Sequence, residues 1–451
     1  MRSNAKILPK KATRTAVLTV ALLLSLLPST ARAAIDGLTS PDGSFQLTAK
    51  ADFIITPDNN SIYMWGYANG SGRMQYPGPT LIVNEGDTVS VQLTNLLPMP
   101  VSIVFPGQQG VTATGGSPGL LTREAASGGG TVSYSFVASR PGTYLYHSGT
   151  RPDLQIEMGL VGALIVRPAL GANFAYNRPD TAFDDEFLFL LSEVDPNVHK
   201  LASRGRLSRI DTTAWFPVYW FINGRCAPDT MMAPYPEAPQ FPTQPYNCMP
   251  MMMPGQKLLM RVIGAGRDLH PFHHHGNHAR VIAADGRPLE GPLGEDLSHW
   301  VFTIQSVPGQ TVDAIFEWTG QNMGWDIYGH EQDIDNAPAG NFPGPEDIDH
   351  NQDGIFDSVP MEMHEYEADH GKPFPVVLPE KQFLTFGGMY SGSPFLGVMG
   401  SLPPGQGGLN PEAGYAYMWH SHAEKEMTNW DIFPGGMMTM LMIVPHTMPM
   451  P

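Results

Sequence analysis

Apolar and polar residues alternate over short segments along most of the chain, and Gly and Pro separate these segments. Residues 78–95 read GPTLIVNEGDTVSVQLTN, in which two alternating runs flank a short turn. A period of two residues is typical of a β-strand with one buried face. No convincing long segment carries the 3.6-residue period of an amphipathic helix, so the pattern predicts an all-β fold.

The order of these segments repeats along the chain. In the first half the segments are 78–95, 102–110, 130–149 and 159–168, and in the second half 255–266, 270–278, 308–318, 415–422 and 435–445. Internal repetition indicates two copies of one architecture. We therefore expect two Greek-key β-sandwich domains, over residues 34–168 and 183–451, with residues 169–182 as the linker.

A long insert interrupts the second copy at about residues 319–414. Between residues 326 and 369 it holds 13 Asp and Glu and no Lys or Arg. Such a segment is expected to be an excursion from the sandwich, ordered by something other than a core of its own.

Within the insert, DHNQDGIFD has the spacing of a calcium-binding loop. The candidate ligands are Asp349, Asn351, Asp353, Ile355 through its carbonyl, and Asp357. Oxygen donors at these intervals, with Gly354 at the turn, suit calcium. Pro360 stands where a bidentate Glu is usual, so the carboxylates as simple solvated side chains remain the alternative.

The composition agrees with a loop-rich β protein. Gly (48) and Pro (43) make up about a fifth of the 451 residues, and 15% of the residues are charged. The formal net charge is −17, and basic residues cluster only near the N-terminus. A surface of this kind disfavours duplex nucleic acid as a partner.

The N-terminus has the pattern of a secretory signal peptide over residues 1–33. A basic segment precedes the mostly apolar residues 16–27, and Ala31-Arg32-Ala33 offers a cleavage site. A membrane span needs about 20 apolar residues, so an uncleaved anchor is the less favoured alternative. We expect a periplasmic or secreted protein without a membrane span.

The chain has two cysteines, Cys226 and Cys248. In an exported protein, two cysteines suggest one disulfide. A pair of metal-binding thiolates is the alternative, although neither has a His or a second Cys close by in the sequence.

Histidines carry the strongest chemical signal. HPFHHHGNH begins at His270, and WHSH ends in His420 and His422. Alternate residues of a strand point to the same side, so His273 and His275 are expected to face together. Crowded imidazoles disfavour protonation of one another, whereas a metal ion binds the neutral ring. The two His-x-His pairs therefore predict a metal site.

The complete HPxHxHG motif and the later HxH strand, within repeated GDTVSVQLTN-like domains, resemble the multicopper oxidases. The resemblance covers about residues 45–168 and 183–446 and leaves out the insert. It implies two cupredoxin-like domains with copper as the cofactor. In that family eight His hold a trinuclear copper cluster, and a type-1 copper bound by Cys and two His receives electrons from the substrate.

The match to the family's first two motifs is incomplete. The first motif, HxHG, falls on IVFPG, where Val104 and Pro106 occupy the His positions. The second, HxH, falls on YHSG, where His147 remains and Gly149 replaces its partner. The resemblance thus implies a single ligand, His147, from the first domain.

The last two motifs retain the cluster ligands of the second domain. The resemblance implies His273, His275, His420 and His422 as copper ligands. His270 takes the type-1 position, but the type-1 cysteine is lost.

At the type-1 position, Ser421 stands in place of the cysteine, Glu426 in place of the second His, and Asp431 near the axial position. A Ser hydroxyl cannot supply the soft ligand of a blue copper. His270 and Glu426 are expected to form a salt bridge, with a site for a harder metal as the alternative.

The most consistent function is an exported copper oxidoreductase with a reduced copper complement and no blue type-1 copper, acting on an unknown small molecule or metal ion. The alternative is a copper-binding protein without turnover, for copper storage, delivery or resistance. A third hypothesis is a scaffold that has lost its metal, which the clustered histidines disfavour.

Two-domain members of the family resemble nitrite reductases in forming trimers. The resemblance therefore implies a homotrimer with the copper site at a subunit interface. A monomer is the alternative, because the first domain has lost three of its four ligands.

Methionine is abundant, with 25 residues. Met249, Met251, Met252 and Met253 cluster in CMPMMMPG, where thioethers could recruit Cu(I) or simply fill space. The methionines of residues 437–442 are interpreted as core residues that fill gaps.

Overall fold

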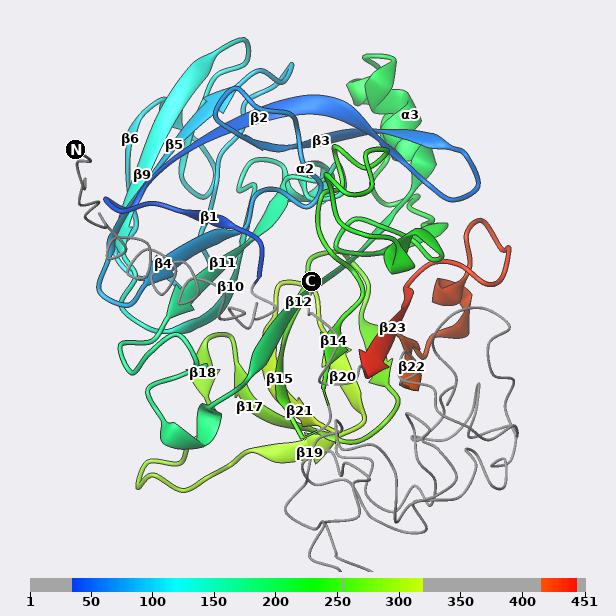
Figure 1. Ribbon diagram of the computed structural model, residues 1–451. Coiled ribbons are helices and arrows are strands. Elements are labelled where there is room, and N and C mark those ends of the chain that lie inside the picture. The colour runs from blue at the N-terminus through cyan, green and yellow to red at the C-terminus, as the bar shows by residue number, and fades with distance from the viewer. Residues whose placement is uncertain (1–34, 254, 319–414, 444–451) are drawn as a thin grey trace, which may run out of the picture.

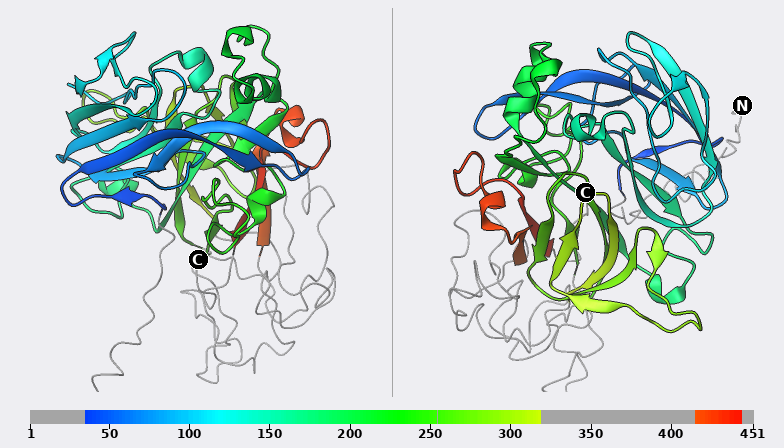
Figure 2. Two further views of the ribbon diagram at one scale, coloured as in Figure 1. Left: turned by 90° about the horizontal axis from the view of Figure 1, so that it is seen from above. Right: turned by 180° about the vertical axis from the view of Figure 1, so that it is seen from behind.

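The computed structural model describes residues 35–253, 255–318 and 415–443. These residues form two β-sandwiches that lie side by side (Figures 1 and 2). The predicted all-β class is confirmed. The predicted signal peptide, the acidic insert and all the candidate calcium ligands lie outside the described residues.

The first sandwich packs a five-stranded sheet against a four-stranded sheet. The five-stranded sheet has the order β3 (Ser61–Asn69), β2 (Ser44–Ile55), β5 (Thr88–Asn95), β9 (Gly130–Val137) and β6 (Thr112–Gly115). The four-stranded sheet has the order β1 (Leu38–Thr39), β4 (Leu81–Asn84), β11 (Val161–Arg167) and β10 (Gly142–His147), and β7 (Ser117–Pro118) pairs with β8 (Arg123–Glu124). Parallel pairs such as β2 with β5 join strands that are not consecutive, as Greek-key crossovers require.

The second sandwich repeats this plan with a larger sheet. The larger sheet has the order β13 (Tyr219–Ile222), β12 (Asp185–Val194), β15 (Lys257–Gly264), β21 (Thr311–Glu317), β17 (Ala279–Ala284) and β18 (Arg287–Pro288), and β19 (His299–Val301) also pairs with β17. The other sheet has the order β14 (Met251–Met252), β23 (Met438–Ile443), β22 (Tyr415–Ser421), β16 (His270–His274) and β20 (Thr303–Ser306). This five-stranded sheet carries the histidine motifs.

Helical segments are short and lie in the connections. They are α2 (Pro152–Gln155), α3 (Pro196–Ser203), and the single turns η1 (Pro179–Thr181), η2 (Leu207–Arg209), η3 (Asp229–Met231) and η5 (Glu424–Met427). α3 begins at Asp195, whose side chain accepts a hydrogen bond from the Asn197 amide at 2.9 Å. Within the described residues, no helix is long and apolar enough to cross a membrane.

The position of a strand decides whether its residues alternate. In β5, Val89, Val91 and Leu93 are buried in the first core, while the residues between them are exposed or half-buried. In β12 every residue is buried, because Phe189 and Leu191 face the second core while Leu188 and Leu190 face the first domain. The apolar run of β12 therefore reflects its place between two domains.

A buried ion network joins the domains beside β12. Arg261 Nε lies 2.9 Å from Glu186 Oε2, and Arg167 pairs with the same carboxylate. Thr143 Oγ1 of the first domain donates to Asp313 Oδ1 of the second at 2.6 Å. Burial raises the pKa of Glu186, but the two guanidinium groups lower it by more. These contacts link the two sandwiches through polar groups that are buried, except for the partly exposed Arg167.

The predicted disulfide is wrong: Cys226 and Cys248 are separate, buried thiols. The reason is their placement on opposite faces of β13. Cys226 packs in the interdomain cluster with Phe221, whereas Cys248 packs in the second core with Ile222. The Cys248 thiol donates instead to the Ile222 carbonyl at 3.1 Å.

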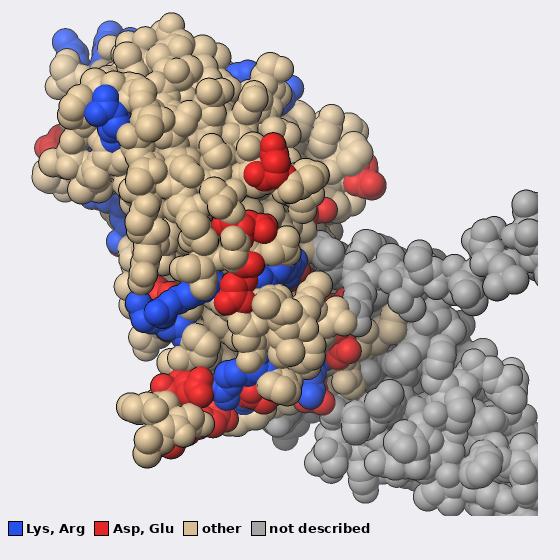
Figure 3. Space-filling model, turned by 90° about the vertical axis from the view of Figure 1, so that its left-hand side faces the viewer, with Lys and Arg blue, Asp and Glu red and all other residues tan. Residues whose placement is uncertain are grey.

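Charged side chains of both signs lie intermixed on the face shown in Figure 3. Ion pairs also lie around η1. Arg178 lies 2.8 Å from Asp180, and Arg280 lies 3.3 Å from the same carboxylate. These ion pairs hold the connection between the sandwiches against β17.

Candidate metal centre

Strands β16 and β22 bring the two histidine motifs together. They pair antiparallel, with His273 opposite His420 and Phe272 opposite Ser421. Phe272 and Trp419 pack in the core of the second sandwich. The alternation of a strand therefore turns His273 and His420 to the outer face of this sheet.

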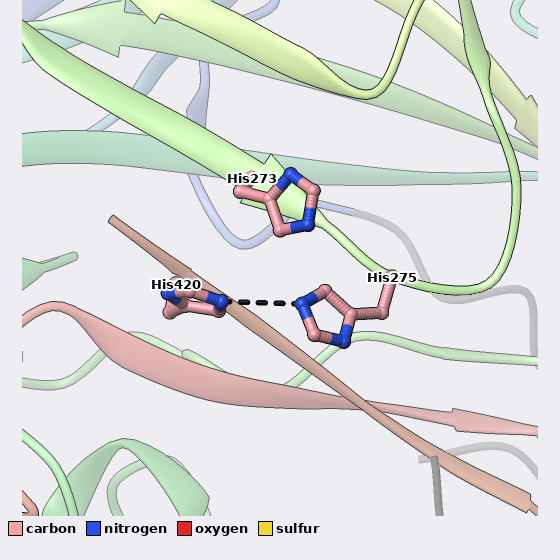
Figure 4. A group of neighbouring side chains, drawn as sticks. All are labelled: His273, His275 and His420. Carbon is pink, nitrogen blue, oxygen red and sulfur yellow. Dashed lines mark hydrogen bonds between the residues drawn. The ribbon is translucent and has the colours of Figure 1, made fainter. Parts of the chain in front are cut away.

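Three histidines converge on that face: His273, His275 and His420. Their nearest ring nitrogens all lie within 4.8 Å of one another. His275 Nε2 and His420 Nε2 are 3.2 Å apart (Figure 4). We call these three residues the histidine trio. All three are buried, so the trio is a compact nitrogen donor set shielded from water.

Hydrogen bonds orient two rings of the trio. His420 Nδ1 donates to the Ser421 carbonyl at 2.8 Å, so the neutral ring presents Nε2 as its acceptor. His273 Nδ1 lies 2.9 Å from Thr303 Oγ1 on β20. Contacts of this kind fix the ring and its tautomer in metal sites.

The surroundings keep these rings neutral. Burial lowers the pKa of His273 to about 4, helped by the neighbouring His420 and His422. Burial likewise lowers the pKa of His420 to about 4. Neutral imidazole is the form that binds a metal ion, so the rings need no deprotonation at neutral pH.

The structure does not bring all five predicted ligands together. His422 follows the end of β22, and its side chain is 54% exposed with Nδ1 3.2 Å from Glu424. Its ring centre lies 4.9 Å from that of His273, so it borders the trio on the solvent side. His147 belongs to β10 of the first domain and lies outside the converging group.

In the first domain the segments of the two motifs are still neighbours, but His147 is the one predicted ligand that they retain. The Val104 amide donates to the His147 carbonyl at 2.9 Å, so the two segments are neighbours. A Cβ atom at Gly149 would lie 2.8 Å from Val104 Cγ1. A larger residue at position 149 would thus have to displace the Val104 side chain.

The type-1 position holds a buried triad of ionisable groups: Glu193, His270 and Glu426. His270 Nε2 lies 2.8 Å from Glu193 Oε2, and His270 Nδ1 lies 2.9 Å from Glu426 Oε2. Ser421 Oγ donates to Glu426 Oε2 at 2.5 Å. Both ring nitrogens of His270 thus already have carboxylate partners.

The charge of this triad follows from its geometry. Burial lowers the pKa of His270, but the hydrogen bonds and charges of Glu193 and Glu426 raise it by more, to about 9. His270 is therefore an imidazolium held between two carboxylates at neutral pH. This favours the predicted salt bridge over the alternative of a harder metal.

Two residues near this position differ from expectation. Glu193 was not predicted, although an acidic residue inside the apolar run of β12 was a usable signal. Asp431, expected near the axial position, is exposed and has a positive φ of 63°. It lies in a turn at the surface and takes no part in the triad.

Comparison with known proteins finds similarity to the multicopper oxidases. The family model described as multicopper oxidase matches residues 55–170. Laccase-24 of Oryza sativa subsp. japonica is 28% identical over 306 residues, which cover 65% of this chain and 45% of the relative. The chain thus resembles the multicopper oxidases through this family model and this relative.

Other members of the superfamily extend the comparison. The L-ascorbate oxidase of Cucumis sativus is 36% identical over 130 residues, covering 28% of this chain and 21% of the relative. The crystal structure of a blue copper oxidase from Nitrosomonas europaea matches with a TM-score of 0.54 at 19% identity, covering 89% of this chain and 85% of that one. The fold is therefore shared with that oxidase. The chain spans less than half the length of the curated relatives it matches.

Proposed function

We propose that this chain is a copper-dependent oxidoreductase with fewer copper ions than the family's full set. One copper site is held by the histidine trio, and there is no blue type-1 copper. The observation that carries the proposal is the convergence of three buried ring nitrogens within 4.8 Å of one another. Imidazole is a common copper ligand. Copper bound there would supply a centre for one-electron transfer.

The chain's own residues suit binding of a small substrate beside this site. Phe302 is 50% exposed, and its ring centre lies 5.8 Å from that of His273. The exposed His422 borders the trio on the same side. An organic substrate would contact the Phe302 ring while His422 accepts or donates a proton near the copper.

Oxygen uptake by copper-loaded protein tests the proposed activity. Phenols, Cu(I) and Mn(II) serve as candidate reductants, and nitrite serves as a candidate oxidant in a separate anaerobic assay. The copper-free protein is the control. Turnover that requires copper supports the oxidoreductase, whereas tight copper binding without turnover supports copper storage, delivery or resistance.

The second candidate has an observation of its own. At the type-1 position the His270 imidazolium lies between two carboxylates, so one negative charge remains uncompensated. A salt bridge thus stands at the position through which electrons enter in the family. A storage or delivery protein would not need that route for electron entry. Export of the chain, expected from residues 1–33, suits either function.

The copper-loaded protein should lack the intense blue absorption of a Cu–thiolate bond. Ser421 offers a hydroxyl, and it is engaged with Glu426. Burial raises the pKa of Cys248 to about 12 and that of Cys226 well above its usual range, so neither forms a thiolate near pH 7. Visible absorption and electron paramagnetic resonance of the Cu(II) form check this, and an intense blue band would contradict it.

We also propose that the chain forms a homotrimer in which His147 of one subunit approaches the trio of the next. A head-to-tail contact of this kind closes into a ring under cyclic symmetry. Multi-angle light scattering should give three times the mass of one chain, and His147→Ala should weaken Cu(II) binding. A monomer whose copper affinity is unchanged by His147→Ala would rule out this assembly.

A further inference from the structure

Methionines line the same sheet face as the histidine trio. In the antiparallel pair of β22 and β23, His420 lies opposite Met438, and Met418 lies opposite Met440. Side chains of opposite residues project to the same face, with Cβ atoms about 4.5–5.5 Å apart. His420, Met438, Met418 and Met440 therefore occupy four adjacent positions on one surface.

The side chains of these methionines pack together in one cluster. Met418 and Met438 are buried in one cluster with Ala227, and the partly buried Met440 packs against it. η3 lies over this cluster, and Thr230 Oγ1 donates to the Met438 carbonyl at 2.6 Å. We call Met418, Met438 and Met440 the methionine cluster.

The row continues to the edge of the sheet. Met442 follows on β23, and β14 pairs parallel with β23 so that Met251 lies beside Met442. Met440, Met442 and Met251 are each partly exposed, whereas the alternate residues Leu441 and Ile443 are buried in the core. Among the methionines of residues 437–442, Met437 and Met438 are therefore buried, as their interpretation as core expects, whereas Met440 and Met442 are partly exposed.

The chemistry of this row fits a soft monovalent cation. Thioether sulfur is a soft, neutral ligand that selects Cu(I). It carries no proton to lose, so binding needs no deprotonation. The row begins at partly exposed Met251 and ends at Met438, beside a trio ligand. It thus offers donors from the solvent to the histidines.

We propose that the methionine cluster is a Cu(I) site, distinct from the histidine trio, through which copper reaches His420. The site takes Cu(I) or Ag(I), with three thioethers as ligands. Its role as an entry route rests on the proposed copper function of the trio. The binding itself does not.

Silver tests the binding without redox chemistry. Ag(I) is titrated into the full-length protein labelled with ¹³C at the methionine methyl groups, and the methyl signals of the cluster should shift first. The triple variant Met418→Leu/Met438→Leu/Met440→Leu lacks these methyl groups, so its Ag(I) affinity is measured by competitive titration against a chelator. Partners that only orient metal ligands contribute about 10–100-fold in affinity. Loss of three ligands should therefore weaken Ag(I) and anaerobic Cu(I) binding by more than about 100-fold.

A matched control separates metal binding from packing. Met64, Met158 and Met260 are fully buried and lie in other clusters. Their triple replacement by Leu should leave Ag(I) affinity unchanged. If the triple variant does not fold, Met438→Leu alone is used in its place. This single variant should still weaken Ag(I) binding.

The histidine variant His273→Ala/His275→Ala distinguishes the two proposals. It should lose Cu(II) binding while the methionine signals still respond to Ag(I). Loss of Ag(I) binding in this variant, or an unchanged Ag(I) affinity in the folded methionine variants, would overturn the methionine site. Wild-type protein that binds Ag(I) at the methionines but no Cu(II) would overturn the proposed function and leave the methionine site standing.

Discussion

Replacement of His420 by alanine should reduce Cu(II) affinity by more than about 100-fold, because loss even of a group that only orients a ligand costs about 10–100-fold. His420 contributes the nitrogen that faces His275 at 3.2 Å. Competitive titration against a chelator measures the affinity, and electron paramagnetic resonance reports the nitrogen ligands. The copper-dependent activity should disappear with the copper.

Two further variants give reference points for this loss of affinity. His299 is an exposed histidine on β19, and His299→Ala should leave Cu(II) affinity unchanged. His422→Ala should have a smaller effect than His420→Ala, because its exposed ring borders the trio without converging on it. Equal losses in His420→Ala and His299→Ala would show that copper does not bind at the trio.

The fold was predictable from the strands that keep one face in water. β5 alternates buried residues with exposed or half-buried ones, as a strand with one buried face should. β12 is different, since both of its faces are covered and its residues do not alternate. Its place between the domains depends on the packing of residues far apart in the sequence, which a local period does not contain.

The candidate site was predictable only as far as strand geometry determines it. The two-residue period turns His273 and His275 to one side, and the antiparallel register sets His420 opposite His273. The same period puts the His422 ring beside those of His273 and His420, with ring centres 4.9 and 5.5 Å away, but it does not determine exposure. The His422 side chain is 54% exposed and its Nδ1 lies 3.2 Å from Glu424, so it borders the trio without joining it.

Contacts between segments far apart in the chain could not be predicted from the sequence. Glu193 meets His270 across 77 residues, and no motif connects them. The methionine row could not be predicted for another reason. In β23 the outer face carries only methionines and the one polar residue, Thr439, lies on the buried face, so no polar residue marks the outer side.

Replacement of His270 by glutamine should destabilise the protein by about 3–5 kcal/mol at pH 6, because it leaves two buried carboxylates without their cation. The loss should depend on pH. The pKa of His270 is raised to about 9 in the folded protein, against 6.5 for an ordinary histidine. Its stabilisation is therefore fully present below pH 6.5 and is lost as the pH rises through 9. The shift corresponds to roughly 3 kcal/mol.

Denaturant unfolding of the wild type and His270→Gln, with and without a chelator, at pH 6 and pH 9.5 measures this effect. The difference in unfolding free energy should be largest at pH 6 and should shrink toward pH 9.5. Asp268 also lies near the triad, so His270→Gln is compared with wild type at each pH to cancel its contribution. Glu193→Gln removes one carboxylate and should shift the pH dependence to lower pH. If His270 and Glu426 instead held a harder metal ion, the difference would grow as His270 deprotonates and would vanish with a chelator. A difference that shrinks with rising pH and ignores the chelator therefore identifies the type-1 position as a salt bridge.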